Sequence, residues 1–184
     1  MVFIRDTREA LAAAAHLVNS LPDRRDPDRL ETLDDYRAFL AEYPYTGTVR
    51  GDADELAAVR GIRSRLRLLW GVDRENAVPL VNAMLADGGA LPQLVIHDEY
   101  DWHVHATGDD EPLETRILVE TAMAFVEVIR SDMYDRVRVC GADDCRGAYI
   151  DFSKNGSKRY CDTGNCGNRM NVNAYRRRRA RETV

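Results

Sequence analysis

Apolar residues recur at helical spacing in five stretches of the chain, and helix-start signals precede four of them. Three starts resemble capping boxes, in which a side-chain acceptor is followed three residues later by an acid: Asp6-x-x-Glu9, Thr32-x-x-Asp35 and Asp52-x-x-Glu55. Pro112 marks a fourth start, because proline suits the first helical position. The pattern predicts helices from Asp6 to Pro22, Thr32 to Pro44, Asp52 to Gly71, Glu75 to Ala86 and Glu111 to beyond Val128, with Pro79 as an alternative start of the fourth.

Helical spacing breaks down between Leu91 and Thr107. Two short apolar and β-branched stretches, Leu94–Ile96 and Trp102–Ala106, flank a polar segment there. They predict a β-hairpin on a helical body. Trp102 itself, like Trp70, is expected to be a core or half-buried aromatic residue.

The last part of the chain has a different pattern. Ala148–Phe152 has the composition of a strand, Ser153–Gly156 contains the turn dipeptide Asn-Gly, and Lys158–Tyr160 reads as the return strand of a hairpin. A helix is expected to begin between Thr163 and Asn165 and to continue to about Arg181. A knuckle, a hairpin and then a helix is the layout of treble-clef-like zinc modules.

These elements predict a predominantly helical α+β protein with two parts. Residues 1–135 form an acidic helical body, and residues 136–184 form what we call the finger. With 45% apolar residues overall, the body is large enough to bury a single core. The junction from Tyr134 to Val139 is short, so we expect the finger to pack on the body.

All four cysteines lie in the finger, as Cys140-x4-Cys145 and Cys161-x4-Cys166 with fifteen residues between the pairs. Two close pairs joined by a segment that can fold back suit a tetrahedral metal, and the favoured interpretation is one Zn²⁺ per chain. A shell of four thiolates leaves no open position, so such a zinc would be structural. Two disulfides, an iron–sulfur cluster and free buried thiols are the alternatives.

Charge divides the chain at nearly the same place. The net charge is −5, but the finger carries 12 basic and 5 acidic residues, a balance of +7, and the body carries a balance of −12. An acidic body with a basic, metal-stabilised end favours binding of the finger to a polyanion.

The predicted last helix carries much of this positive charge. At 100° per residue Arg169, Asn173 and Arg176 share one face, and Arg177, Arg178 and Arg179 follow. Arginine binds phosphates or guanine, and the amides of Asn168 and Asn173 can pair with adenine. The alternative is a solvated basic terminus that complements the helix dipole.

Cys166-Gly167-Asn168-Arg169 resembles the signature of the CGNR zinc-finger family of bacterial proteins, and the segment from Asp151 to Cys161 resembles its hairpin. Members of this family also carry an N-terminal helical domain of a stress-induced transcription regulator. Leu17–Ser20 and Val59–Arg63 resemble parts of that domain, with Gly61 as a departure. Met170-Asn171 also departs from the family, because a basic residue is expected shortly after the tetrad.

The resemblance implies a zinc-containing transcription regulator that binds double-stranded DNA. A homodimer and a small-molecule effector are left open as further partners. A module that binds RNA or protein, with Tyr149, Phe152 and Tyr160 as stacking platforms for RNA, is the alternative. The residues predicted to contact nucleic acid are Lys154, Lys158, Arg159, Asn168, Arg169, Asn173, Arg176, Arg177, Arg178 and Arg179.

Three of the four histidines, His97, His103 and His105, lie in the predicted body hairpin beside acidic residues. A second metal site or a ligand pocket there is one interpretation. The favoured interpretation is a polar strand face with ordinary surface histidines. The chain has no phosphate-binding glycine loop, G-x-S-x-G or H-E-x-x-H motif, so we expect no enzyme. It also has no signal peptide or membrane-length apolar run, so we expect a cytoplasmic protein without membrane contact.

Overall fold

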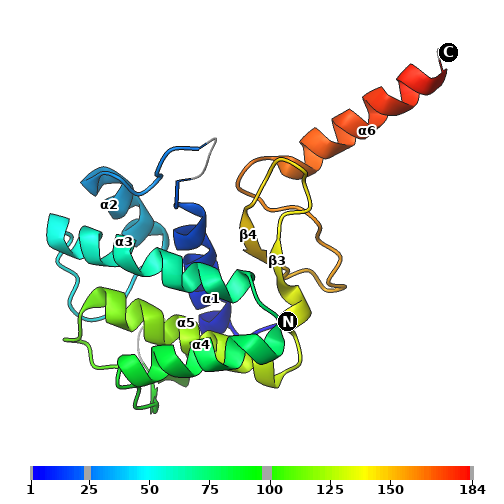
Figure 1. Cartoon of the computed structure of the whole chain (residues 1–184). Helices are drawn as coiled ribbons and strands as arrows, with labels where there is room; N and C mark the ends of the chain where they lie inside the picture. The colour runs from blue at the N-terminus through cyan, green and yellow to red at the C-terminus, as the bar shows by residue number, and fades with distance from the viewer. Residues whose placement is uncertain (1, 23–25, 97–100, 183–184) are drawn as a thin grey trace.

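The computed structural model describes residues 2–22, 26–96 and 101–182, and shows a helical body, a small sheet and a projecting last helix (Figure 1). The body contains helices α1 (Arg5–Asn19), α2 (Leu33–Glu42), α3 (Ala53–Arg67), α4 (Arg74–Asp87) and α5 (Leu113–Arg130), a 3-10 turn (Leu68–Trp70) and strands β1 (Gln93–Val95) and β2 (His103–His105). The finger contains a 3-10 turn (Tyr134–Arg136) at its junction, strands β3 (Val137–Val139) and β4 (Ala148–Ile150) and helix α6 (Cys166–Glu182). The predicted helical α+β class is confirmed.

Helix α5 lies at the centre of the body and packs against α1, α3 and α4. The apolar face predicted for it is buried, with Ile117, Phe125 and Val128 at most 1% exposed. Trp70 packs edge-on against Phe125 with ring centroids 5.6 Å apart. Burial of each such side chain contributes about 1.5–3 kcal/mol, so α5 anchors the core of the body.

Side-chain caps set the beginnings of α2, α3 and α4. The Thr32 hydroxyl accepts from the Asp35 N–H at 3.1 Å, and the Asp35 carboxylate accepts from the Thr32 N–H at 2.9 Å. The Asp52 carboxylate accepts from the Glu55 N–H at 2.8 Å, so both predicted starts are confirmed, although the Glu55 carboxylate accepts from the Gly51 N–H and not from that of Asp52. Asp73 caps α4, and Pro79 lies inside that helix, so the alternative start at Pro79 is wrong.

The beginning of α1 differs from the prediction. The helix starts at Arg5, so Asp6 lies inside its first turn and no side chain caps it. Glu9, the expected partner of the cap, pairs with Arg5 at 2.9 Å. Phe3 is 2% exposed and packs against Phe152, with ring centroids 6.2 Å apart. This buried anchor in front of the helix fixes where the chain enters α1.

The predicted body hairpin is confirmed, with β1 and β2 antiparallel and Leu94 opposite Val104. His103 and His105 share one face, as alternation predicts, with their Nε2 atoms 3.1 Å apart. His103 is only 8% exposed, so the interpretation as ordinary surface histidines is wrong for it. Trp102 is 64% exposed, which corrects the expectation of a core or half-buried ring.

The small sheet in the finger pairs other segments than those predicted. β4 pairs with β3, Val137 opposite Ile150, and the cysteine knuckle forms the connection. The expected return strand at 158–160 is not a strand. The fully buried carboxylate of Asp151 accepts from the N–H groups of Ser153 and Lys158, at 2.9 and 2.8 Å. These bonds fold 151–158 into a loop in place of a ladder.

The finger packs on the body as predicted, through β4. The Asn19 side chain at the end of α1 donates to the Ala148 carbonyl at 2.8 Å and accepts from the Ala148 N–H at 2.7 Å. It therefore satisfies both backbone groups that an added strand would pair with. Trp70 Nε1 donates to the Tyr149 carbonyl at 3.1 Å.

A buried ion pair ties the α1–α2 connection to α3. Arg63 is 4% exposed and donates to both carboxylate oxygens of Asp28, at 2.7 and 2.8 Å. Arg63 also donates to the Ser20 carbonyl and hydroxyl, at 3.2 and 3.0 Å. The hydrogen bonds from Arg63, supported by the Leu30 N–H and by Arg60, hold the pKa of Asp28 well below its usual range against the opposing effect of burial.

We predict that Asp28→Asn lowers the free energy of unfolding by about 3 kcal/mol at pH 7, because the Arg63 charge stays buried without its counter-ion. The difference from wild type should narrow below about pH 4, where the unfolded chain takes up a proton that folded Asp28 resists. Urea unfolding at several pH values measures both effects.

The control for this prediction is Asp34→Asn, which removes an exposed pair with Arg37. We expect it to cost less than about 0.5 kcal/mol. Equal losses for the two variants would contradict a special role for the buried pair.

Candidate metal centre and basic helix

The knuckle between β3 and β4 presents the first two cysteines. Cys140 follows β3, and its N–H donates to the Gly147 carbonyl at 2.8 Å, which extends the pairing of the two strands. The Cys145 N–H donates to the Ala142 carbonyl at 3.0 Å and closes a tight turn. The turn brings both thiols to the same end of the small sheet.

The other two cysteines approach from the opposite side. The Gly141 N–H donates to the Arg159 carbonyl at 2.9 Å, which holds the segment before Cys161 against the knuckle. Cys166 is the first residue of α6, so the helix begins one residue after the predicted range of Thr163 to Asn165. A thiolate at that position is stabilised by the helix dipole and by unpaired N–H groups of the first turn.

The four sulfur atoms all lie within 4.8 Å of one another. The Sγ atoms of Cys145 and Cys161 are 3.7 Å apart, and those of Cys161 and Cys166 are 3.8 Å apart. A tetrahedral zinc with Zn–S bonds of about 2.3 Å places its ligand sulfurs about 3.8 Å apart. The separations are far too long for disulfides, and they suit one ion better than a multi-iron cluster, which spreads its thiolates.

Hydrogen bonds around the cluster offset its negative charge. The N–H groups of Gly147 and Cys161 donate to the sulfurs of Cys145 and Cys140, at 3.3 and 3.4 Å. Burial, followed by contacts with neighbouring thiols, raises the pKa of the Cys166 thiol far above its ordinary value. A divalent cation is therefore what allows all four thiols to ionise together.

Arg169 belongs to the surroundings of the metal centre. Its guanidinium donates to Cys166 Sγ at 3.3 Å and to the Asp144 carboxylate at 2.8 Å. Asp144, in the knuckle, was not identified from the sequence, because no local motif links it to a residue 25 positions away. The arginine predicted to contact nucleic acid thus joins α6 to the knuckle across the cluster.

The remaining predicted contact residues lie in two places. Lys154 and Arg159 are exposed on the loop after β4, while Lys158 pairs with Asp162 and lies 5.5 Å from the centre of the Tyr149 ring. On α6, Asn168 donates to Asn165 at 2.8 Å. The exposed group at the far end of the helix consists of Asn173, Arg176, Arg177, Arg178 and Arg179.

Helix α6 projects away from the body, with the chain terminus at its far end (Figure 1). Every residue from 171 to 179 is exposed. Among the side chains of α6 that the structure describes, those at its start are packed: Cys166 is fully buried and Met170 lies against the cysteine cluster. The metal centre therefore fixes one end of a helix whose basic end is open to a partner.

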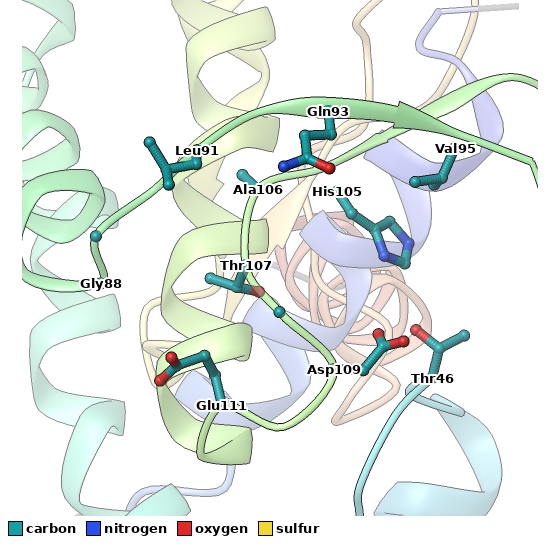
Figure 2. A pocket seen from close by; sticks show the side chains of 12 residues that line it. Thr46, Gly88, Leu91, Gln93, Val95, His105, Ala106, Thr107, Asp109 and Glu111 are labelled. Carbon is teal, nitrogen blue, oxygen red and sulfur yellow. The ribbon is translucent and has the colours of Figure 1, made fainter.

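The possible second metal site in the body hairpin lies partly outside the described residues, because these do not include His97, Asp98 and Glu99. Over the described ranges, the four cysteines are the one group of at least three metal-binding side chains close enough to share an ion. A hollow of about 610 Å³ does lie beside the hairpin, and Figure 2 shows the His105 ring extending from the strand toward Thr46 and Asp109.

Two known families match the chain. Residues 136–179 match the family described as "CGNR zinc finger", and residues 7–132 match the family described as "Putative stress-induced transcription regulator". No curated protein matches the sequence. The first match spans all four cysteines, which together bind one zinc ion.

We predict that Gly147→Ala weakens zinc binding about tenfold or more. A Cβ atom at this position would lie 2.9 Å from Cys161 Sγ and 3.4 Å from Cys145 Sγ, so the cluster would have to distort. Competition with a chromogenic chelator measures the affinity.

Gly61→Ala is the control for this substitution, because Gly61 is exposed in α3 and a Cβ there meets nothing within 4 Å. It should leave zinc affinity unchanged and stabilise the chain by about 1 kcal/mol. Unchanged zinc affinity in Gly147→Ala would contradict the tight fit around the cluster.

We further predict that Arg169→Ala speeds the loss of zinc to excess chelator about tenfold, because Cys166 loses a charged hydrogen-bond donor. Arg176→Ala, on the exposed part of the same helix, should release zinc at the wild-type rate. Stopped-flow absorbance of the chelator complex follows both. Indistinguishable rates would show that Arg169 does not support the metal centre.

Proposed function

The chain belongs to the family described as "Putative stress-induced transcription regulator" and ends in a CGNR zinc finger, and from this premise we propose that it regulates transcription by binding double-stranded DNA. Zinc holds the beginning of α6, and the basic end of that helix contacts the DNA. The observation that carries the proposal is the exposed run Arg176–Arg179 on a helix fixed at its other end by the metal.

The dimensions of α6 support insertion into DNA. Its 17 residues span about 25 Å, and an α-helix fits the major groove of B-DNA. Arg176, Arg177, Arg178 and Arg179 would neutralise phosphates, while the Asn173 amide would reach base edges. Lys154 and Arg159 would add phosphate contacts from the loop. We assign Arg169 and Lys158 a smaller role, because each already has an acidic partner.

The charge distribution supports the same orientation. The body carries a net charge of −12 and the finger +7. Because α6 projects away from the body, the basic helix can approach the phosphates while the acidic surface stays back (Figure 1). Long-range attraction would then orient the protein with α6 leading.

A protein partner is the second candidate, because Val172 and Tyr175 lie three residues apart on α6 and are 47% and 54% exposed. The RNA alternative is weaker. Tyr149 is 5% exposed, and Phe152 packs against Phe3, so these two rings are not open stacking platforms.

Several finer features belong to the same proposal. We propose action by binding and not by catalysis, in the cytoplasm, where the thiols stay reduced. A two-fold dimer would lengthen the DNA site, and the dimer stays a prediction.

In the part of the chain that the structure describes, no helix combines the length and apolar character needed to cross a membrane.

We predict that affinity for duplex DNA falls steeply with salt. Replacing Arg176 to Arg179 with Ala should make the slope of log affinity against log salt concentration shallower by about 0.9 per lost phosphate contact. Fluorescence anisotropy with labelled duplex at several salt concentrations measures the slope. A double variant at Arg37 and Arg50, exposed in the body, should keep the wild-type slope. DNA binding that survives the four substitutions, or no binding by zinc-loaded wild type at low salt, would overturn the proposal.

A further inference from the structure

A groove runs along α5, between that helix, α1 and the body hairpin. It encloses about 1140 Å³ and is lined by Glu120 and Tyr45 as well as by Ser131 and Phe152 near the finger. It adjoins the hollow of Figure 2, because Thr46 and His105 line both. This space is large enough for a small organic molecule.

Small apolar residues leave this space open. Ala13 of α1 and Ala124 of α5 are each 3% exposed and line the groove, with Ala41 of α2 nearby. Met123 and Val126 add apolar surface along α5. An apolar ligand body in this part of the groove would be removed from water.

Glu120 differs from three other carboxylates of the groove, which all have partners. Glu127 accepts from the Thr7 hydroxyl, Glu9 pairs with Arg5 at 2.9 Å and Glu42 lies 3.5 Å from the His16 ring. Among the residues that the structure describes, no donor contacts the Glu120 carboxylate.

The cation with most influence on Glu120 is already engaged elsewhere. Arg116 donates to the carbonyls of Thr46, Thr48 and Glu111. Burial raises the pKa of Glu120 to about 7, against an opposing effect of Arg116. A carboxylate of this kind is stabilised by a cation that enters the groove.

The groups around Glu120 also suit a positive ligand. Burial and then the Glu120 charge raise the pKa of Tyr45 well above its ordinary value, so its neutral ring lies within the field of this carboxylate. The His103 ring is held within the hairpin, with Nδ1 2.9 Å from the Asp101 carbonyl and Nε2 3.1 Å from His105 Nε2.

The positive side chains of the groove include Arg8, which lies over the Phe152 ring at 4.8 Å, and Arg130, near the C-terminal end of α5. Glu120 lies ten residues before Arg130 on that helix, about 15 Å along its axis. Arg130 therefore lies well away from the Glu120 carboxylate along the groove, while Arg116, one helical turn before Glu120, donates to backbone carbonyls.

We propose that this groove binds an organic cation, an ammonium or guanidinium group on an apolar body, with Glu120 as its counter-ion. The Tyr45 ring lies beside the cationic group, and the apolar body lies along Ala13, Ala41 and Ala124. Binding here does not depend on the proposed DNA function. It would give the regulator a ligand site that touches the finger through Phe152.

Three probes with one carbon skeleton test this proposal: 4-phenylbutylamine, 4-phenylbutanol and 4-phenylbutyrate. Titration calorimetry at pH 8 on the zinc-loaded full chain should show the amine binding at least about tenfold tighter than the alcohol, and the acid weakest of the three. Equal binding of the three probes, or no binding of the amine at millimolar concentration, would overturn the proposal.

Three variants locate the cation and the apolar body of the ligand. Glu120→Gln should make the amine bind no better than the alcohol, and Glu75→Gln, at an exposed carboxylate of α4, should leave the preference intact. Ala41→Phe adds bulk to the groove wall and keeps the Glu120 carboxylate, so it should weaken amine and alcohol alike. An amine preference that persists in Glu120→Gln would place the cation elsewhere and contradict the assignment.

Discussion

Four thiols held within 4.8 Å of one another cannot all ionise unless a cation lies between them. In this finger that cation connects three segments that are otherwise joined by a few polar contacts: the knuckle after β3, the loop after β4 and the first turn of α6. Few large apolar side chains surround the cluster in the described part of the finger: Tyr149 is buried in it, and Tyr160 and Met170 pack at its edge. The free energy of zinc binding therefore contributes directly to folding this part of the chain.

The contact between finger and body depends on a second, different interaction. The side chain of Asn19, the last residue of α1, forms hydrogen bonds with both backbone groups of Ala148, as a neighbouring strand would. Ala148 and Ile150 are part of the same buried core as the body helices. The finger is thus built on the body, and α6 alone extends beyond it. This arrangement gives the basic helix a fixed origin and an exposed end.

Sequence reasoning succeeded where the deciding interactions are local and failed where they are distant. The Thr32–Asp35 cap and the two Cys-x4-Cys pairs each lie within a few residues of sequence, and the cap and the zinc ligands were predicted. The pairing of β4 with β3 was not predicted. The Asp151 carboxylate accepts from the Lys158 N–H, which a return strand would have used. The Asp144 partner of Arg169 and the groove beside Glu120 likewise result from packing between distant segments.

We infer that zinc, and not packing alone, holds the finger and the start of α6. Hydrogen exchange of the full chain with and without bound zinc measures this dependence. Removing zinc should abolish protection of the first turn of α6 and of the β3–β4 connection, while α1, α3 and α5 keep theirs. Equal protection of the finger with and without zinc would show that packing alone holds it.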